Sequence, residues 1–473
     1  MKCIFSTTLI LFFLIQGFAQ TINFNLADPQ PVIQEVYGGS ILSGDLDNDG
    51  DTDLVQSGIG ENLTGQSAEP SVFLNDGNGS FTLEEQSFNN FFTTEQMVLG
   101  DLDNDGDLDL IISGFNRTDF YRNDGQAQFI HDDSTPFQPF DAGELIIGDV
   151  DGDGDNDVLQ YGQLNASNPF ALLFLNDGTG GFTQAQDVNL TPFLLAAIAF
   201  IDLEGDGDLD ILSFGKNNND EAQIGVYKNN GSGNFSVFSD SNLAPHFADE
   251  FSVADIDNDG DEDVLVTGVF TNSLPKTILY INDGNGSFSE LSNTSFPDIF
   301  ASDNAFADLD NDNDLDVVLI GSMDGGNSNI FSIVFENLGN NNFIAADSLG
   351  GEYIPANTIA DFNGDSKKDI IIQGFVDDTN IYWNTSIFSS VEENAAIPFS
   401  VFPNPTNGQF HIEWGEEAFN RIEIIDQHGK SIYDESIEER GLHFIDINLP
   451  VGMYYVKMSG DSSTSTQKIL LSR

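Results

Sequence analysis

Cysteine is nearly absent from this chain of 473 residues. Its only cysteine, Cys3, precedes an apolar N-terminal run, which excludes a disulfide framework. Basic residues are also scarce, because 14 Lys and Arg stand against 78 Asp and Glu, for a formal net charge of −64. Such acidity makes nucleic acid a poor partner. Long apolar runs are missing as well, since no stretch approaches the roughly twenty residues that a membrane-spanning helix needs, and we expect no transmembrane segment.

The one apolar segment lies at the N-terminus. Residues 1–19 begin with Lys2, continue with an apolar run and end in small residues up to Ala19. This pattern is typical of a cleaved secretory signal peptide. We expect the mature chain to begin at Gln20 or Thr21 and to be secreted or held at the outer-membrane cell surface. Without disulfides, packing and metal must stabilise it.

Hydrophobic residues make up 40% of the chain, and 41 residues are Phe. That content is enough to bury a substantial core, so a disordered polyanion is the weaker interpretation. A compact fold with a charge of −64 repels itself unless cations neutralise part of the charge. The composition therefore predicts a folded protein that binds cations.

An acidic nine-residue cassette, D-x-D-x-D-G-x-x-D, recurs seven times. The cassettes begin at Asp45, Asp101, Asp149, Asp202, Asp255, Asp308 and Asp361, at spacings of 56, 48, 53, 53, 53 and 53 residues. A fixed period of about fifty residues indicates a repeat architecture. We number the cassettes one to seven in chain order.

Each repeat contains four short strand signals. An apolar run precedes the cassette, another follows it, and an Asn-Asp-Gly turn such as residues 75–77 separates two further runs. No segment has the length or the caps of a helix. Four strands in each of seven units predict an all-β fold with a seven-bladed calcium-binding β-propeller.

The spacing of Phe predicts how the ring closes. A Phe lies 20 residues before the next cassette in five units, as Phe81 does, and Phe24 lies 21 residues before the first cassette. Residues 22–26 are therefore the last strand of a unit whose beginning is missing, while the seventh unit stops near residues 382–384 without its own Gly-rich turn and closing Phe. Joining the two ends completes one blade and leaves no sheet edge exposed. We expect the Phe residues themselves to pack between blades.

The cassette has the chemistry of a calcium loop. Carboxylates at its first, third, fifth and ninth positions can converge on one cation, the seventh position can add a backbone carbonyl, and Gly at the sixth allows the loop to turn. Magnesium fits less well because it requires a stricter octahedron. A helix-loop-helix calcium site needs Glu at position twelve, which no cassette has. Solvated Asp-Gly turns without metal are the plainer alternative. The candidate ligands are Asp45, Asp47, Asp49, Asp51 and Asp53; Asp101, Asp103, Asp105, Asp107 and Asp109; Asp149, Asp151, Asp153, Asp155 and Asp157; Asp202, Glu204, Asp206, Asp208 and Asp210; Asp255, Asp257, Asp259, Asp261 and Asp263; Asp308, Asp310, Asp312, Asp314 and Asp316; and Asp361, Asn363, Asp365, Lys367 and Asp369.

The seven cassettes are not equivalent. The fourth has Glu204 in place of Asp, the sixth has Asn313 in place of Gly, and the seventh has Asn363 with Lys367 and Lys368 beside it. We predict up to seven Ca²⁺ ions, of which the seventh is held most weakly because two ammonium groups oppose it. If calcium is structural, its removal by a chelator should lower the melting temperature.

The cassettes and the Asn-Asp-Gly-x-Gly-x-Phe turns together resemble a known group of repeats. Residues 100–109 and 74–81 are similar to the FG-GAP or VCBS repeats of integrin α-subunit propellers and bacterial surface proteins. The resemblance spans residues 21–388 and implies a calcium-stabilised propeller used in adhesion or recognition, with the metal ligands at the Asp positions named above. We take residues 20–388 as the propeller.

A different composition follows a linker at residues 389–398. Short alternating segments between residues 409 and 458 predict a small C-terminal β-sandwich over residues 399–473. Pro403-Asn-Pro405, residues 426–430 and the final Lys468-Ile-Leu-Leu471 resemble the C-terminal sorting domain of type IX secretion cargo. That resemblance implies the type IX secretion machinery as a partner, and afterwards either release or surface attachment.

Signals of catalysis are few. His131 and His246 are the only histidines of the propeller, and neither belongs to a nucleophile motif. Propellers with similar repeats resemble polysaccharide lyases, in which His246 or Tyr161 would serve as a base. The favoured function is a recognition or adhesion module for an extracellular glycan or protein; a polysaccharide lyase and a purely structural surface protein are the alternatives.

A ligand should meet the face opposite the cassettes. The distance from the end of a cassette to the Asn of the next turn is 22, 14, 19, 19, 19, 21 or 15 residues, so the loop lengths vary on that face. Variable loops on a rigid scaffold favour recognition. The candidate segments are residues 58–71, 215–223 and 322–329.

Overall fold

The structure is a computed structural model, and it describes two parts of the chain, residues 22–386 and 399–471. The expected signal peptide, the linker and Pro403-Asn-Pro405 lie outside the described residues. Within the two parts, the description omits residues 32, 34–35, 38, 61–67, 90–95, 115–116, 141, 165–167, 187, 270–273, 293, 327–328, 340, 375–378, 403–405, 407, 415–418, 427–429, 438–441, 448, 450–451 and 461–463.

The chain separates into two compact units, residues 1–388 and 389–473. All regular structure in the described residues is β-strand. Among those residues there is no helix with the length and apolar character needed to cross a membrane.

The first unit contains seven antiparallel sheets, each built from consecutive strands around one cassette. Their strands are β3 (Ile41–Gly44), β4 (Asp53–Gly60), β5 (Ala68–Asn75) and β6 (Phe81–Glu84), with β2 (Val36–Tyr37) also paired to β4; β7 (Gln96–Gly100), β8 (Asp109–Gly114), β9 (Arg117–Asn123) and β10 (Phe129–Asp132); β11 (Ala142–Gly148), β12 (Asp157–Gln163), β13 (Pro169–Leu175) and β14 (Thr183–Gln184); β15 (Leu194–Ile201), β16 (Asp210–Lys216), β17 (Ala222–Lys228) and β18 (Ser236–Val237); β19 (Phe247–Ala254), β20 (Asp263–Val269), β21 (Pro275–Asn282) and β22 (Phe288–Glu290); β23 (Phe300–Ala307), β24 (Asp316–Ser322), β25 (Ile330–Asn337) and β26 (Phe343–Leu349); and β27 (Ala356–Ala360), β28 (Asp369–Gln373) and β29 (Asn380–Asn384) with β1 (Phe24–Leu26).

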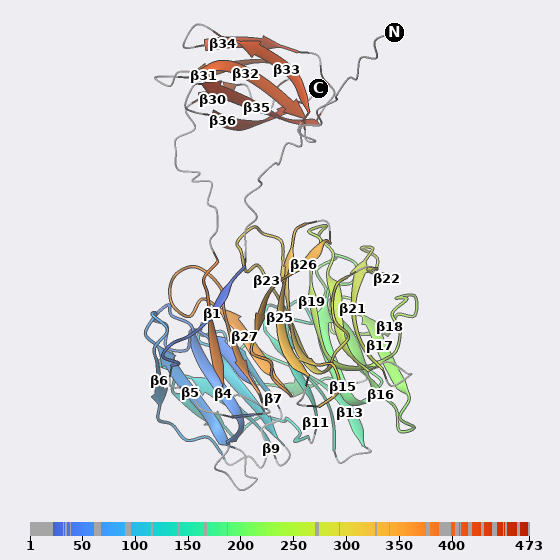
Figure 1. Cartoon of the computed structure of the whole chain (residues 1–473). Helices are drawn as coiled ribbons and strands as arrows, with labels where there is room; N and C mark the ends of the chain where they lie inside the picture. The colour runs from blue at the N-terminus through green and yellow to red at the C-terminus, as the bar shows by residue number, and fades with distance from the viewer. Residues whose placement is uncertain are drawn as a thin grey trace, which may run out of the picture. The chain divides into compact units, whose positions relative to one another are not determined.

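These sheets are arranged as the blades of a propeller (Figure 1). The first strand of each blade contacts the first strand of the next, in the order β3, β7, β11, β15, β19, β23 and β27, and β27 contacts β3 again. The first strands therefore form a closed ring. The predicted all-β, propeller-like fold is confirmed.

The ends of the propeller meet in one blade. Strand β1 pairs antiparallel with β29, with Phe24 opposite Asn384 and Leu26 opposite Tyr382. The backbone N–H of Phe24 also donates to Asp347 Oδ2 at 2.6 Å, which ties β1 to the preceding blade. The N-terminal strand thus covers the free edge that β29 would otherwise expose.

The hydrophobic core of the propeller consists of seven clusters, one between each pair of neighbouring blades. The cluster between the last and the first blade, for example, contains Ile371, Phe362, Leu54 and Phe81. The conserved spacing of Phe has the expected role, because Phe24, Phe129 and other members of the series pack in these clusters. Burial between blades, rather than within one sheet, stabilises the ring.

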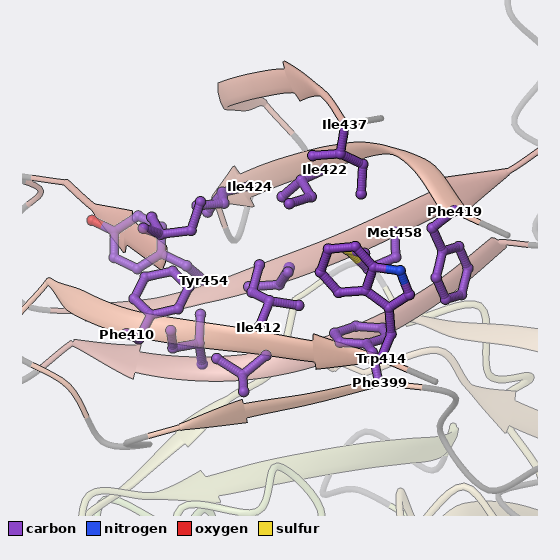
Figure 2. Close-up of a cluster of buried hydrophobic side chains, with 14 residues drawn as sticks. Phe399, Phe410, Ile412, Trp414, Phe419, Ile422, Ile424, Ile437, Tyr454 and Met458 are labelled. Carbon is purple, nitrogen blue, oxygen red and sulfur yellow. The ribbon is translucent and has the colours of Figure 1, made fainter. Parts of the chain in front are cut away.

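The second unit is a β-sandwich. One sheet contains β30 (Phe399–Phe402), β31 (Gln409–Trp414) and β34 (Leu442–Asp446); the other contains β33 (Ser431–Ser436), β32 (Phe419–Asp426), β35 (Gly452–Gly460) and β36 (Thr464–Leu471). Alternate side chains of both sheets, including Phe410, Ile412, Trp414 and Met458, form a single core (Figure 2). The inward-facing residues are those that the alternating pattern predicts.

We predict that the N-terminal segment that closes the ring, residues 22–26, contributes strongly to stability. Ile22 is fully buried between two blades, whereas Leu26 is 53% exposed. Ile22→Ala should cost about 2–5 kcal/mol of unfolding free energy, and the matched Leu26→Ala less than about 0.5 kcal/mol. Denaturant unfolding of both variants measures the difference. Equal effects would contradict a docked N-terminal segment.

Candidate metal centres

Each cassette connects the first and second strands of its blade in a loop with two left-handed residues. In cassette two, Asn104 at the fourth position has φ of 59° and Gly106 at the sixth has φ of 95°. The same two positions are left-handed in every cassette, including Asn313 (72°) and Ser366 (67°), where Gly is replaced. Asn tolerates this region and Ser less so. The requirement at the fourth position was not foreseen, although only Asn or Gly occurs there.

The first and fifth carboxylates shape the loop. Asp101 Oδ2 accepts a hydrogen bond from the Gly106 N–H at 3.1 Å, and Asp105 Oδ1 accepts one from the Asp107 N–H at 3.0 Å. These bonds recur throughout the series and wrap the chain around the carboxylates. In cassettes one and two the other oxygen of the first carboxylate is buried without a donor, whereas in cassettes three to seven it also accepts a backbone N–H of the loop.

Several inward oxygens have no hydrogen-bond donor. Asp45 Oδ1, Asp101 Oδ1, Asp103 Oδ1, Asp151 Oδ1 and Asp257 Oδ1 are buried without one. A buried carboxylate oxygen without a partner is unfavourable unless a cation neutralises it. These atoms come from four cassettes, and in each they are oxygens that would coordinate a bound divalent ion. The donor set therefore fits a hard cation.

Five cassettes bring three carboxylates close enough to share an ion. In each group, one oxygen per residue lies within 4.8 Å of the others. The described carboxylates of cassettes four and seven form no such group. The groups are Asp45, Asp47 and Asp53; Asp101, Asp103 and Asp109; Asp149, Asp151 and Asp157; Asp255, Asp257 and Asp259; and Asp308, Asp310 and Asp316.

The structure thus unites the first and third predicted positions in all five groups, with the ninth position in four and the fifth in one. In three cassettes the seventh position has another role. Asp107 Oδ1 accepts a hydrogen bond from Asn48 Nδ2 at 2.6 Å, and Asp155 Oδ1 accepts one from Asn104 Nδ2 at 2.5 Å. These side chains link cassettes of neighbouring blades and are not among the clustered oxygens.

The ninth carboxylate is buried and accepts two backbone hydrogen bonds, which we call the bracket. Asp109 Oδ2 accepts the Leu102 N–H at 3.0 Å, and Asp109 Oδ1 accepts the Asn123 N–H at 2.9 Å. The equivalent pair of bonds occurs in all seven blades. Each cassette is thereby joined to the turn of its own blade.

The Asn of that turn extends the bracket to the preceding blade. Asn123 Nδ2 donates to the Leu46 carbonyl at 2.8 Å, and Asn75 Nδ2 donates to the Phe362 carbonyl at 2.9 Å, which joins the first blade to the last. The other five Asn residues make the same contact. Sequence reasoning assigned these residues only to a tight turn. The recurrence of Asn at this place in all seven repeats, before Asp-Gly in four of them, was the available signal.

Burial raises the pKa of the ninth carboxyl in every cassette. The pKa is about 6 for Asp53 and Asp157, about 7 for Asp109, Asp210, Asp263 and Asp369, and about 8 for Asp316. The two backbone hydrogen bonds oppose this shift, and the third and fifth carboxylates of most cassettes reinforce it. Without a cation, the protein therefore holds these carboxylates in an unfavourable environment.

Neighbouring side chains distinguish three cassettes. The residue just before the bracketing Asn approaches the third cassette position: Lys228 Nζ lies 2.7 Å from Glu204 Oε2, and Arg122 Nη1 lies 2.5 Å from Asp103 Oδ2. In cassette six the equivalent residue is Glu336, whose charge contributes, after burial and Asp312, to raising the pKa of Asp310 to about 7.

In cassette seven, the Lys367 ammonium lies 3.8 Å from Asp365 Oδ2, on the fifth position. Asn363 Nδ2, at the third position, lies 3.5 Å from Asp369 Oδ1. The weakest calcium affinity, expected for this cassette, stays a prediction.

The two candidate bases lie in the interior. His246 is fully buried, its Nδ1 lies 2.7 Å from the Ala244 carbonyl, and burial lowers its pKa to about 4. Tyr161 is also fully buried, its hydroxyl donates to the Thr191 carbonyl, and burial raises its pKa. His131 pairs instead with Asp119 and Asp133 near the edge of its blade. Neither His246 nor Tyr161 can reach a polysaccharide in this conformation.

The loops opposite the cassettes join the second and third strands of each blade. Residues 217–221 form a closed turn in which the Asn217 N–H donates to the Glu221 carbonyl at 3.0 Å, and Lys216 pairs with Asp220 at 2.7 Å. In the third candidate segment, Asp324 Oδ1 accepts the Gly326 N–H at 3.1 Å. Residues 61–67, half of segment 58–71, lie outside the described residues.

Comparison with protein-family models identifies two elements of the chain. Residues 45–112, 101–160, 202–266 and 255–319 match the FG-GAP-like repeat. Residues 400–472 match the secretion system C-terminal sorting domain. Both matches confirm the resemblances found in the sequence. None of the curated proteins matches the chain significantly.

Among solved structures, a lectin of Agrocybe aegerita, described as recognising non-reducing terminal N-acetylglucosamine, is similar with a TM-score of 0.50 and 20% identity, over 72% of this chain and 86% of the lectin. The Aleuria aurantia lectin has a TM-score of 0.38 and 11% identity, over 67% and 97%. The V. cholerae biofilm matrix protein Bap1 has a TM-score of 0.31 and 11% identity, over 93% and 88%. The first of these supports the propeller-like fold.

We predict that the bracketing Asn is essential to blade packing. Asn282→Ala removes bonds from Nδ2 to the Leu203 and Glu262 carbonyls, at 3.1 and 3.2 Å, and leaves buried acceptors unpaired. The cost should be about 1–3 kcal/mol in unfolding free energy. Asn285→Ala, in the exposed part of the same turn, is the control and should cost much less. A control as damaging as Asn282→Ala would refute the bracket.

Without divalent cations, stability should fall as the pH rises. The ninth carboxyls have raised pKa values, so between pH 4 and 7 the folded state binds more protons than the unfolded state. Their contribution is largest at low pH and is lost as the pH passes through about 7. In a chelator, the melting temperature should therefore decrease from pH 5 to pH 8.

High salt separates this effect from repulsion between exposed charges, which salt screens. The decrease should persist in about 0.5 M NaCl, where the screening length is only a few ångströms. A melting temperature that rises with pH in chelator would contradict the assignment.

Proposed function

We propose a function for this protein from the premise that it is a secreted or cell-surface protein built on FG-GAP-like repeats and carrying a type IX secretion C-terminal sorting domain. Its propeller is a calcium-stabilised recognition or adhesion module for an extracellular glycan or protein. The observation that carries the calcium assignment is the repeated group of three carboxylates with buried oxygens that lack donors.

Calcium is the cation that these groups favour. It accepts six to eight oxygen ligands in flexible loops, whereas magnesium needs a stricter octahedron. Asp101, Asp103 and Asp109 would supply three ligands in cassette two, and backbone carbonyls and water would complete the shell. Calcium would neutralise carboxylates that burial and mutual repulsion otherwise disfavour. Its role would be structural, because the cassettes lie at the junctions between blades.

Recognition is assigned to the opposite face. The cassettes and the turns that contain the bracketing Asn are joined by the brackets and so share one face, on which the seven repeats follow one pattern. The loops of the other face differ in length. A rigid ring with variable loops is a common design for binding sites. The A. aegerita lectin, which recognises N-acetylglucosamine, makes glycans the first class of ligand to test.

A polysaccharide lyase is the second candidate, and the interior positions of His246 and Tyr161 weigh against it. We propose that the sorting domain delivers the propeller through the type IX machinery and is then removed, so that the mature propeller is released or attached to the surface. The proposed division is a signal peptide at 1–19, the propeller at 20–388, a linker at 389–398 and the sorting domain at 399–473.

The test is a glycan and protein array probed with the mature chain in calcium. We expect saturable binding to one class of ligand and no product absorbing at 235 nm when that ligand is a polysaccharide. Asn218→Ala with Asn219→Ala, in an exposed loop of the proposed recognition face, should weaken binding if this loop contacts the ligand.

The matched control is Asn230→Ala with Asn234→Ala, in the exposed turn of the cassette face of the same blade, which should leave binding unchanged. Unsaturated product at 235 nm would establish a lyase instead, and an array without any binding would favour a structural surface protein. A melting temperature that calcium leaves unchanged would refute the calcium-stabilised scaffold.

A further inference from the structure

We infer that cassette four carries its own cation: the ammonium group of Lys228 occupies the place that calcium takes in the sibling cassettes, so this blade junction forms without a metal ion. The inference rests on the proposed calcium scaffold and assigns a different counter-ion to one of its seven loops.

The Lys228 ammonium is held on three sides. Its Nζ lies 2.7 Å from Glu204 Oε2, at the third cassette position, and 3.5 Å from the Asn285 carbonyl oxygen of the next blade. It also lies 4.1 Å from the centre of the Phe238 ring. Carboxylate, carbonyl oxygen and an aromatic face are all favourable neighbours of an ammonium ion. With only 22% of its side chain exposed, Lys228 has a defined position rather than a solvated one.

The sibling blades show what this place looks like without a lysine. The residue before the bracketing Asn is Leu175 in the third blade and Ile281 in the fifth. In those blades the third carboxylate, Asp151 or Asp257, belongs to a group of three convergent carboxylates. Cassette four has the longer Glu204 at this position and forms no such group. The lysine and the altered carboxylate occur together in this one blade.

Arg122 shows that a basic residue at this position need not replace the ion. Its guanidinium divides between Asp103 Oδ2 at 2.5 Å and Asp132 Oδ2 at 3.0 Å, and Asp132 lies outside the cassette. Asp103 Oδ1 keeps its buried position without a donor, and the carboxylates of cassette two still converge. The arginine therefore divides its charge between the cassette and a carboxylate outside it, whereas the lysine pairs with Glu204 of cassette four.

Electrostatics disfavours a calcium ion beside the Lys228 ammonium. An ammonium group and a divalent ion within about 4 Å of each other repel strongly, because little water lies between them to screen their charges. The Lys228 ammonium also neutralises the Glu204 carboxylate, and the loop of cassette four keeps its conformation. The junction between the fourth and fifth blades should thus remain formed when calcium falls, while the junctions next to convergent carboxylates weaken.

Calcium stoichiometry tests the inference directly. Glu204→Asp combined with Lys228→Leu gives cassette four the residues of cassette three at both positions. In the mature full-length chain, isothermal titration should then count one calcium ion more per chain than in the wild type. Lys216→Leu, which removes a comparable lysine-aspartate pair from the far end of the same blade, should leave the count unchanged.

Melting in chelator gives a second readout. Lys228→Leu alone should lower the melting temperature in chelator, because Glu204 loses its counter-ion, and calcium should restore part of the loss. Lys216→Leu should change the melting temperature much less under both conditions. Because the single variant keeps Glu204, this comparison tests the role of Lys228 even if the double variant fails to fold.

The outcomes separate this inference from the calcium scaffold. If the wild-type chain binds calcium and Glu204→Gln removes one ion, or if the double variant binds no additional ion, then Lys228 does not replace calcium. If the wild-type chain binds no calcium at all, the calcium scaffold itself is refuted. A wild-type count unaffected by Glu204→Gln, together with one extra ion in the double variant, supports the inference.

Discussion

The propeller depends on one repeated set of hydrogen bonds. The buried ninth carboxylate of each cassette accepts two backbone N–H groups, one from its own loop and one from the Asn of its own turn, and that Asn reaches the carbonyl of the preceding blade. Seven such brackets connect seven blades, and the bond from Asn75 to the Phe362 carbonyl closes the circle. Burial of the carboxylates strengthens these bonds because little water competes for them.

The same bracket creates the demand for cations. Burying a carboxylate beside the first, third and fifth carboxylates raises its pKa, and the loop leaves further oxygens without donors. A divalent ion between them would meet this demand in five cassettes, and we assign the demand in the fourth to Lys228. Stability and cation binding are therefore properties of the same residues, which leaves the variable loops of the opposite face available for recognition.

Much of this arrangement could be predicted from the sequence. The period, the four strand signals and the offset of Phe24 indicated blades, a ring and the packing role of Phe, because each depends on local spacing. The sequence pattern placed Asn75 and the equivalent Asn residues of the other repeats only in a turn. For the seventh cassette position, such as Asp107, it predicted a metal ligand from the backbone carbonyl. Their side chains act on neighbouring blades. A partner more than fifty residues away in sequence leaves no local pattern, and only the fold brings such groups together.

The sequence by itself determined the repeat, the all-β class, the exported character and the chemistry of the acidic loops, since these follow from periodicity and composition. Tertiary structure decided which oxygens converge, and it left the candidate bases His246 and Tyr161 inside the core. It also brought Lys228, at the end of β17, close to Glu204 in the loop between β15 and β16. The physical reason is that the distance between charges, and the water around them, are set by packing between strands and blades and not by the order of residues along the chain.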